Sequence, residues 1–102
     1  MNTRPRDRAT ILERLRRLRP EMEWRFGIER IGLFGSAACG TLSDASDIDL
    51  LVVFRGKGTL DGYFDLKGYL EQALGRPVDL VTERGLKPRA RAPVERDLIR
   101  VP

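Results

Sequence analysis

Apolar residues in the first part of the chain recur at intervals of three and four, which is the spacing of one helix face. The recurring positions are Ile11, Leu12, Leu15 and Leu18. Charged residues fill most of the positions between them. This pattern predicts an amphipathic helix over residues 7–19.

Capping and turn-forming residues set the expected limits of this helix. Asp7 or Thr10 is suited to cap the first turn, because either side chain can accept a hydrogen bond from a free backbone N–H. Pro20 is expected either to end the helix or to open a short second helix over residues 21–26. Gly27 would close that second helix.

Three apolar runs predict strands over residues 28–34, 47–54 and 78–82. The middle run is almost continuously apolar from Ile48 to Phe54, which is typical of a strand covered on both faces. We therefore expect this strand to lie in the centre of a sheet.

The segments between and after the strands predict helices and one loop. Residues 37–40 are small enough for a single helical turn, and residues 41–46 are rich in turn formers. An apolar stripe predicts a helix over residues 60–74, which Gly75 would stop. The tail is expected to hold one short helix around residues 94–99. Helices and strands alternate along the chain, so the expected fold is a layered α/β or α+β domain.

Length and charge narrow the interpretation further. A chain of 102 residues forms one domain, expected to span residues 1–102. The net charge is +4, with nine basic and five acidic residues in 1–30, four and eight in 31–83, and six and two in 84–102. An acidic centre between basic ends differs from the uniformly basic surface of a nucleic-acid coat. Direct binding of nucleic acid is therefore not expected, and the central acids need cations.

The residue types that the chain lacks exclude several kinds of chemistry. It has no histidine and one cysteine. Ser-His and Cys-His nucleophile pairs, histidine-based zinc sites and an internal disulfide are therefore excluded. No apolar run approaches the roughly 20 residues that span a bilayer, and the first residues do not resemble a signal peptide. We expect a cytoplasmic protein that does not contact a membrane.

Three carboxylates lie where packing alone would not place them. Asp47 and Asp49 stand two residues apart at the start of the central run, so a strand would place both on one face. Asp79 interrupts the third predicted strand in the same way. Grouped carboxylates repel each other and lose hydration when buried, and a divalent cation relieves both costs. If the two strands are neighbours, the three side chains form one cluster.

The oxygen-only character of this cluster indicates which metal and substrate it suits. Carboxylates without histidine or cysteine suit magnesium or manganese rather than zinc. Two such ions about 4 Å apart can activate an attacking oxygen and stabilise a leaving one. Gly35 ends the first strand and allows a close approach of backbone to a ligand, and Ser36 adds a hydroxyl donor. The segment is a candidate site for a triphosphate and its metal ions.

Each of these features also has an ordinary structural explanation. Gly35 and Ser36 can form a simple turn. Asp79 can pair with Arg76 or Arg84. The conjunction of Gly-Ser and Asp-x-Asp at one fixed spacing is expected by chance in about one in a thousand chains of this length. We therefore favour the joint interpretation.

These motifs resemble a known signature. Gly-Ser at residues 35–36 and Asp-x-Asp at residues 47–49 are separated by ten residues. This arrangement resembles the Gly-Ser-x10-Asp-x-Asp signature of the polymerase-beta-like nucleotidyltransferase superfamily. The sequences around both motifs resemble its minimal nucleotidyltransferase branch, and residues 77–81 resemble the strand that carries the third acid of that branch. The similarity covers nearly the whole chain.

The resemblance implies a fold, a reaction and a partner. It implies a mixed sheet flanked by helices, with Asp47 and Asp49 as ligands of both metal ions. Asp79 would bind the catalytic ion and help to activate the acceptor hydroxyl, while Gly35 and Ser36 would contact the nucleotide phosphates. The implied reaction is magnesium-dependent transfer of AMP from ATP to an acceptor oxygen, with loss of pyrophosphate. Members of this branch are commonly antitoxins of HEPN-domain toxins and resemble enzymes that transfer AMP to a toxin tyrosine.

Two positions depart from the pattern of this branch. Ala37 and Cys39 stand where relatives often carry arginines. The departure motivates a second hypothesis, a non-catalytic antitoxin that covers the active site of its partner. A third hypothesis, a nucleic-acid-binding repressor, rests on the basic ends of the chain. We interpret Cys39 itself as a small packed residue.

The acceptor is expected to be held by another protein. Relatives that act on transfer RNA or on small-molecule drugs carry further domains, for which this chain has no room after the catalytic core. The predicted N-terminal helix has a basic face that is either a docking surface or an ordinary solvated surface. Its residues are Arg14, Arg16, Arg17 and Arg19.

Overall fold

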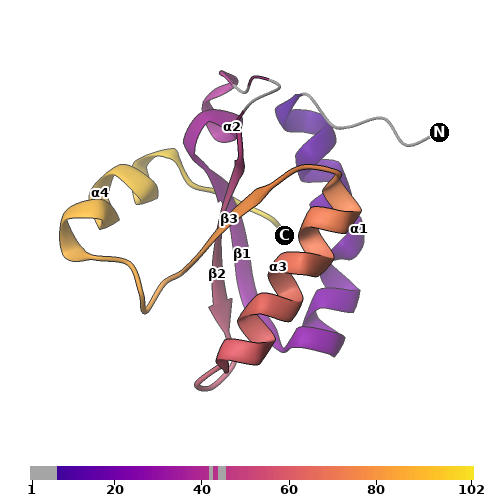
Figure 1. Ribbon diagram of the computed structural model, residues 1–102. Helices are drawn as coiled ribbons and strands as arrows, with labels where there is room; N and C mark the ends of the chain where they lie inside the picture. The colour runs from indigo at the N-terminus through magenta and orange to yellow at the C-terminus, as the bar shows by residue number, and fades with distance from the viewer. Residues whose placement is uncertain (1–6, 42, 44–45) are drawn as a thin grey trace.

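The computed structural model describes residues 7–41, 43 and 46–102. In chain order the elements are α1 (Arg8–Phe26), β1 (Ile28–Phe34), α2 (Gly35–Cys39), β2 (Ile48–Phe54), α3 (Leu60–Leu74), β3 (Val78–Thr82), α4 (Pro88–Asp97) and β4 (Ile99–Arg100). Within this part of the chain, four strands form a sheet of order β3-β2-β1-β4 (Figure 1). β2 is parallel to β3 and antiparallel to β1, which is also antiparallel to β4. The mixed sheet flanked by helices is confirmed.

The two faces of the sheet are covered differently. α1 and α3 lie on one face, and α4 lies on the opposite side and stands off from the strands (Figure 1). Ile48, Leu50 and Val52 of β2 are completely buried in the core that α1 and α3 share with the sheet. Because side chains alternate along a strand, Asp49 and Leu51 point to the other face, which we call the open face.

The ends of α1 follow from local chemistry. The side chain of Asp7 accepts a hydrogen bond from the backbone N–H of Thr10 at 2.7 Å, so Asp7 rather than Thr10 is the cap. Gly27 adopts the left-handed conformation at φ 65°, and its N–H donates to the carbonyl of Glu23. Gly27 therefore ends the helix as expected.

Pro20 does not end α1 or open a second helix, so the prediction of a boundary there is wrong. The helix runs from Arg8 to Phe26 with Pro20 inside it. A proline inside a helix removes one hydrogen bond and costs about 3 kcal/mol. Leu15 and Met22, on either side of it, are both completely buried in one core. Their burial offsets that cost and keeps the helix continuous.

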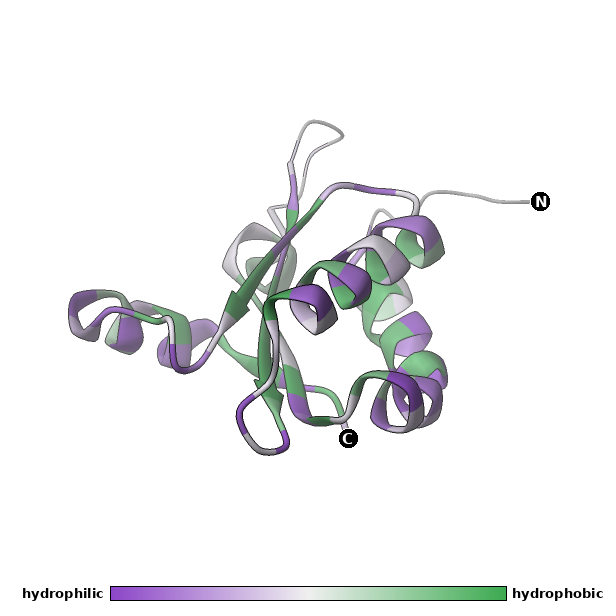
Figure 2. Ribbon diagram, turned by 60° about the horizontal axis from the view of Figure 1, so that its bottom comes forward, coloured by the Kyte–Doolittle hydropathy of each residue, from purple (hydrophilic) through white to green (hydrophobic). Residues whose placement is uncertain are grey.

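The C-terminal region differs most from the prediction. The helix expected around residues 94–99 is α4, which begins earlier, with Pro88 in its first turn, and passes through Pro93. β4 was not predicted, because two residues are too few to show a pattern. β4 pairs with Gly32 and Leu33 of β1. α4 is largely hydrophilic (Figure 2), and within the described residues no helix is long and apolar enough to cross a membrane.

The other predicted elements agree with the structure. The strands over residues 28–34 and 78–82 and the helix over residues 60–74 have the predicted bounds, and the central strand begins one residue later, at Ile48. The small residues after the first strand form α2, a helix of five residues. Of the predicted loop over residues 41–46, positions 42, 44 and 45 lie outside the described residues.

Candidate active site

The strand register brings two of the three predicted acids together. Asp49 of β2 is paired with Asp79 of the parallel strand β3 on one side. On its other side, Asp49 is paired with Phe34, the last residue of β1. Both acids lie on the open face because their neighbours Ile48 and Leu80 are buried in the core. The two carboxylates are therefore adjacent at one end of the sheet.

A hydrogen bond between two segments far apart in the chain fixes this register. The backbone N–H of Ile48 donates to the carbonyl of Pro77 at 3.0 Å. The backbone N–H of Val78 in turn donates to the carboxylate of Glu71 on α3 at 2.9 Å. These bonds align the starts of β2 and β3, one residue before Asp49 and Asp79 in each strand.

Asp49 is the acid whose environment is most perturbed. It is half-buried, whereas Asp47 and Asp79 are exposed. Burial, followed by the negative charges of Asp79 and Asp47, raises the pKa of Asp49 to about 6. A carboxylate in this setting gains from a nearby cation more than an ordinary surface carboxylate does.

The turn after β1 is built against Asp49. Gly35 has a positive φ of 70°, and a Cβ at this position would collide with a carboxylate oxygen of Asp49. Only glycine combines this conformation with so close an approach. Ser36 follows directly, half-buried, in the first turn of α2. The predicted phosphate-contacting pair therefore lies beside the predicted metal ligand.

Asp47, the third predicted acid, is less closely associated with the other two. Asp47 precedes β2 and is exposed, and its charge is the smallest contribution to the raised pKa of Asp49. In the ranges that the structure describes, no three Asp, Glu, Cys or His side chains form a group that could hold a metal ion. The adjacent carboxylates of Asp49 and Asp79 nevertheless fit magnesium, which takes one or two protein carboxylates and completes its shell with water and phosphate oxygens.

Arg84, one of the two arginines considered as a structural partner of Asp79, does not pair with it. Among the described residues no ion pair joins the two. Arg84 lines an apolar hollow of about 270 Å³ together with Phe54 and Lys57. Phe54 ends β2, whereas Asp49 lies near its start, so this hollow is at the opposite end of the sheet from the acids.

Arg76 supports the site, and its role was not predicted. Its side chain is 3% exposed, and its guanidinium donates to the carbonyls of Ser43 and Ser46 at 2.9 and 3.2 Å. These residues belong to the segment that leads into Asp47. A buried cation bonded to these two main-chain carbonyls fixes the positions of Ser43 and of Ser46, the residue before Asp47. The position of an arginine just after α3 gave no signal of this role.

The positions that depart from the family pattern differ in exposure. Ala37 is 1% exposed and belongs to the core, whereas Cys39 is exposed. The interpretation of Cys39 as a packed residue is therefore wrong. Cys39 is the last residue of α2, where the helix is closed by Gly40 in the left-handed conformation. An arginine side chain would have room at position 39.

A family model described as a nucleotidyltransferase domain matches residues 15–101. The chain belongs to this family. The protein adenylyltransferase MntA of Thermococcus cleftensis is 40% identical over 81 residues, which are 79% of this chain and 82% of MntA. A protein of Methanocaldococcus jannaschii, provisionally named a protein adenylyltransferase, is 36% identical over 96 residues, with 91% and 96% of the two chains covered.

Solved structures agree with this assignment. A protein provisionally named a minimal nucleotidyltransferase is 43% identical, with a TM-score of 0.78 over 91% of this chain and 94% of its own. A toxin–antitoxin structure with AMP-PNP contains a chain that is 28% identical, with a TM-score of 0.67 over 92% of this chain and 71% of its own. The protein is thus an enzyme of the nucleotidyltransferase family, in the minimal branch whose named members include protein adenylyltransferases.

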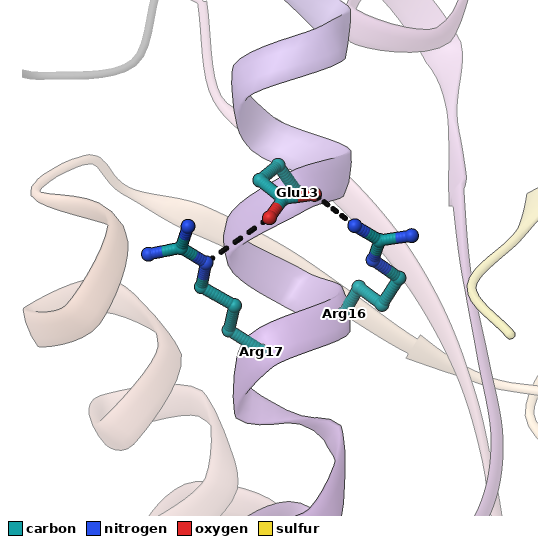
Figure 3. A network of polar contacts seen from close by, with 3 residues as sticks. All are labelled: Glu13, Arg16 and Arg17. Carbon is teal, nitrogen blue, oxygen red and sulfur yellow. Dashed lines mark hydrogen bonds and ion pairs between the residues drawn. The ribbon is translucent and has the colours of Figure 1, made fainter.

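The basic face of α1 in this nucleotidyltransferase is partly structural. Arg16 and Arg17 both pair with Glu13, at 2.6 and 3.0 Å, on the surface of the helix (Figure 3). Arg19 pairs with Glu23 at 2.9 Å and also donates to the carbonyls of Glu29 and Val101. Arg19 therefore ties α1 to β1 and to the C-terminal residues, and it is not part of a free docking surface.

Proposed function

We propose that this nucleotidyltransferase transfers AMP from ATP to a tyrosine hydroxyl of a HEPN toxin and thereby acts as its antitoxin. The observation that carries the proposal is the adjacency of Asp49, Asp79 and Gly35 at one end of the open face. This arrangement offers an anionic metal site directly beside a glycine turn that a phosphate can approach. The branch of the family and the toxin–antitoxin neighbour supply the class of partner.

The acids and the turn have separate tasks in the proposed reaction. Asp49 and Asp79, with Asp47 at the edge, would hold two magnesium ions, and manganese has the same ligand preference. Bound magnesium would neutralise the triphosphate and stabilise the charge that develops on the leaving pyrophosphate. Gly35 and Ser36 would contact the phosphates, with the serine hydroxyl as donor.

The transfer step balances as a single displacement. The tyrosine oxygen bonds to the α-phosphorus of ATP, and the bond from that phosphorus to the bridging oxygen of the β-phosphate breaks. Pyrophosphate leaves with the bonding electrons. The hydroxyl proton passes to the carboxylate of Asp79, which is exposed and so can be reached by an acceptor from outside. The product is a tyrosine-linked AMP.

A label-transfer experiment tests this proposal. Purified protein, magnesium and ATP labelled on the α-phosphate are added to lysate of the native host, with Asp49→Asn as the matched control. The proposal expects a labelled protein band with the unmodified enzyme and none with the variant. ATP labelled on the γ-phosphate should leave the band unlabelled. Equal labelling by Asp49→Asn would contradict the proposed site.

A second candidate function is favoured by positions 37 and 39. The resemblance to the minimal branch implies arginines here, and this chain has Ala37 and Cys39 instead, which leaves fewer cations for the triphosphate. A non-catalytic antitoxin would neutralise its partner by covering it. In that case Asp49→Asn would protect as well as the unmodified protein, at equimolar dose and without ATP. A requirement for ATP would exclude this function.

A further inference from the structure

Asp79 stands on a strand that has a neighbouring strand on one side only. In the described part of the sheet, β3 is the first strand in the order β3-β2-β1-β4, so its other side is an edge. Backbone groups along such an edge have no partner strand. Asp49, in contrast, lies on β2, which is paired on both sides. Of these two acids, Asp79 is therefore the one that the sheet holds less firmly.

Backbone groups along β3 point alternately toward β2 and toward the edge. The carbonyl of Pro77 and the N–H of Glu83 form hydrogen bonds with β2. The parallel ladder uses every second residue of β3, so the backbone groups of Val78 and Leu80 face the edge. Val78 and Leu80 are the neighbours of Asp79 in the chain. A contact with either group therefore acts on a residue directly next to the acid.

Side chains of α3 bind both of these edge groups. The carboxylate of Glu71 accepts a hydrogen bond from the N–H of Val78 at 2.9 Å, and the hydroxyl of Tyr63 donates to the carbonyl of Leu80. Glu71 and Tyr63 are eight residues apart, which is about two helical turns, so both lie on one face of α3. We call these two side chains the β3 clamp. The clamp holds the residue before Asp79 and the residue after it.

The β3 clamp is itself held in place by its helix. Leu66 and Leu70 of α3 are completely buried in the core. The carboxylate of Glu71 also accepts a hydrogen bond from the ammonium group of Lys67 at 3.2 Å, one turn earlier. Two donors, one from β3 and one from α3, thus fix the orientation of this carboxylate.

We propose that Glu71 and Tyr63 are positioning residues, which set the placement of the Asp79 carboxylate beside that of Asp49 for a metal ion. This inference rests on the proposed function, because it concerns a metal ligand of that site. Magnesium demands a nearly ideal geometry, with ligand distances of about 2.0–2.1 Å. Groups that orient a metal ligand therefore affect the affinity for the ion although they do not touch it.

Binding of manganese measures the effect of the β3 clamp without any need for AMP transfer. Manganese(II) alone is the probe, and the free ion is followed by its electron paramagnetic resonance signal. Tyr63→Phe removes only the hydroxyl and should weaken binding roughly tenfold. Tyr69→Phe is the matched control, because in the part of the chain that the structure describes its hydroxyl forms no hydrogen bond with β3. It should leave the affinity unchanged, and an equal loss in both variants would overturn the role of Tyr63.

Glu71 offers a second comparison, at constant charge. Glu71→Met and Glu71→Gln remove the same negative charge, but the glutamine carbonyl can still accept a hydrogen bond from the N–H of Val78. Glu71→Met should weaken manganese binding roughly tenfold, and Glu71→Gln should restore most of that loss. Equal losses in the two variants would assign the effect to charge and would overturn the role of the hydrogen bond.

An Asp79→Ala background separates positioning from a general loss of stability. Once the carboxylate of Asp79 is gone, Tyr63→Phe should cause no further loss of manganese affinity, although it should still lower stability. A further tenfold loss in this background would show that Tyr63 does not act through Asp79. Unchanged affinity in Tyr63→Phe and Glu71→Met, or no manganese binding by the unmodified protein, would also overturn the proposal.

A parallel assay of AMP transfer distinguishes failure of the clamp from failure of the proposed function. The expected loss of manganese affinity, in a protein whose unmodified form transfers no AMP, would uphold the clamp and contradict the function. AMP transfer that requires Asp49 and Asp79, with a kcat and a manganese affinity that Tyr63→Phe and Glu71→Met leave unchanged, would uphold the function and overturn the clamp.

Discussion

The backbone of Gly35 lies so close to the carboxylate of Asp49 that no Cβ fits between them. Gly35 is the first residue of α2, directly after β1, whereas Asp49 lies on β2, and the pairing of Phe34 with Asp49 brings the two together. A turn that any residue could form would not need glycine here. The close approach therefore links the motif proposed to contact phosphate and the motif proposed to bind metal as one structural unit.

Replacing this glycine should inactivate the enzyme. Gly35→Ala places a methyl group against Asp49 and strains a backbone at φ 70°, so we expect AMP transfer to fall at least a hundredfold and stability to fall by about 1–3 kcal/mol. Gly40→Ala is the matched control, because φ is 76° there and a Cβ meets nothing within 4 Å. It should lose about 1 kcal/mol of stability and retain transfer. Similar activities for the two variants would contradict the account.

The raised pKa of Asp49 predicts how stability depends on pH in metal-free protein. The folded state holds this proton up to about pH 6, whereas the unfolded state releases it near 3.8, so stability falls as the pH rises between these values. Asp49→Asn should therefore stabilise the metal-free protein at pH 7, by about 1–2 kcal/mol after allowance for solvent screening. The gain should vanish below about pH 4, as denaturant unfolding across the pH range would show.

An acid distant from Asp49 gives the control for this effect. Asp65 is exposed on α3, away from the acids of the open face. Asp65→Asn should change stability little at any pH between 4 and 7. A pH-independent gain in Asp49→Asn, or the same profile in both variants, would show that the charge of Asp49 is not destabilised by burial and by Asp79.

Magnesium should stabilise the folded protein by binding to the carboxylates of Asp49 and Asp79. A cation at ten times its Kd adds about 1.4 kcal/mol, which for a domain of this size raises the Tm by about 5 °C or more. Thermal unfolding with magnesium, and again after chelation, measures the effect. Asp49→Asn and Asp79→Asn should each lose most of it, whereas Asp65→Asn should keep it. An equal rise in all three variants would place the ion elsewhere.

An arginine at position 39 should improve the use of ATP. Cys39 is exposed at the end of α2, so Cys39→Arg introduces a cation without disturbing the core. One charge-assisted contact to a phosphate would lower the KM for ATP roughly tenfold. Cys39→Ser controls for loss of the thiol and should leave the KM unchanged. No change with arginine would show that position 39 does not reach the nucleotide.

Arg76 should act as a positioning residue. Arg76→Met removes the donors to the carbonyls of Ser43 and Ser46, so we expect a loss of about 2–3 kcal/mol of stability. Ser46, the neighbour of Asp47, should then be held less firmly, which should lower kcat and the response to magnesium at temperatures where the variant is folded. Arg76→Lys keeps the charge but cannot reproduce the fork of donors, and it should rescue only part of the loss. A folded Arg76→Met variant whose kcat equals that of the unmodified enzyme would contradict this role.

The sequence predicted the parts of the fold that are encoded locally. The strand from Ile28 to Phe34 and the helix from Leu60 to Leu74 are bounded by residues whose conformational preferences are strong, and both were predicted correctly. The continuity of α1 through Pro20 was missed because it depends on burial of residues before and after the proline. β4 was missed because its two residues are defined only by pairing with β1.

The candidate site was predicted in its composition but not in its arrangement. The motifs identified Gly35, Asp49 and Asp79, but their contact depends on a register that a hydrogen bond from Ile48 to Pro77 establishes. The support from Arg76 depends on the positions of the Ser43 and Ser46 carbonyls, for which the sequence has no periodic pattern.

Turnover tests the central claim, that Asp49 and Asp79 catalyse AMP transfer to the partner, most directly. The partner is captured on tagged Asp49→Asn protein, separated from it, and mixed in large molar excess with the unmodified enzyme, magnesium and α-labelled ATP. The account predicts that labelled partner exceeds enzyme many times over, that partner toxicity is lost in proportion, and that Asp49→Asn does neither. The claim would be contradicted if the partner were neutralised only at equimolar dose, stayed unlabelled, and were neutralised equally well by Asp49→Asn.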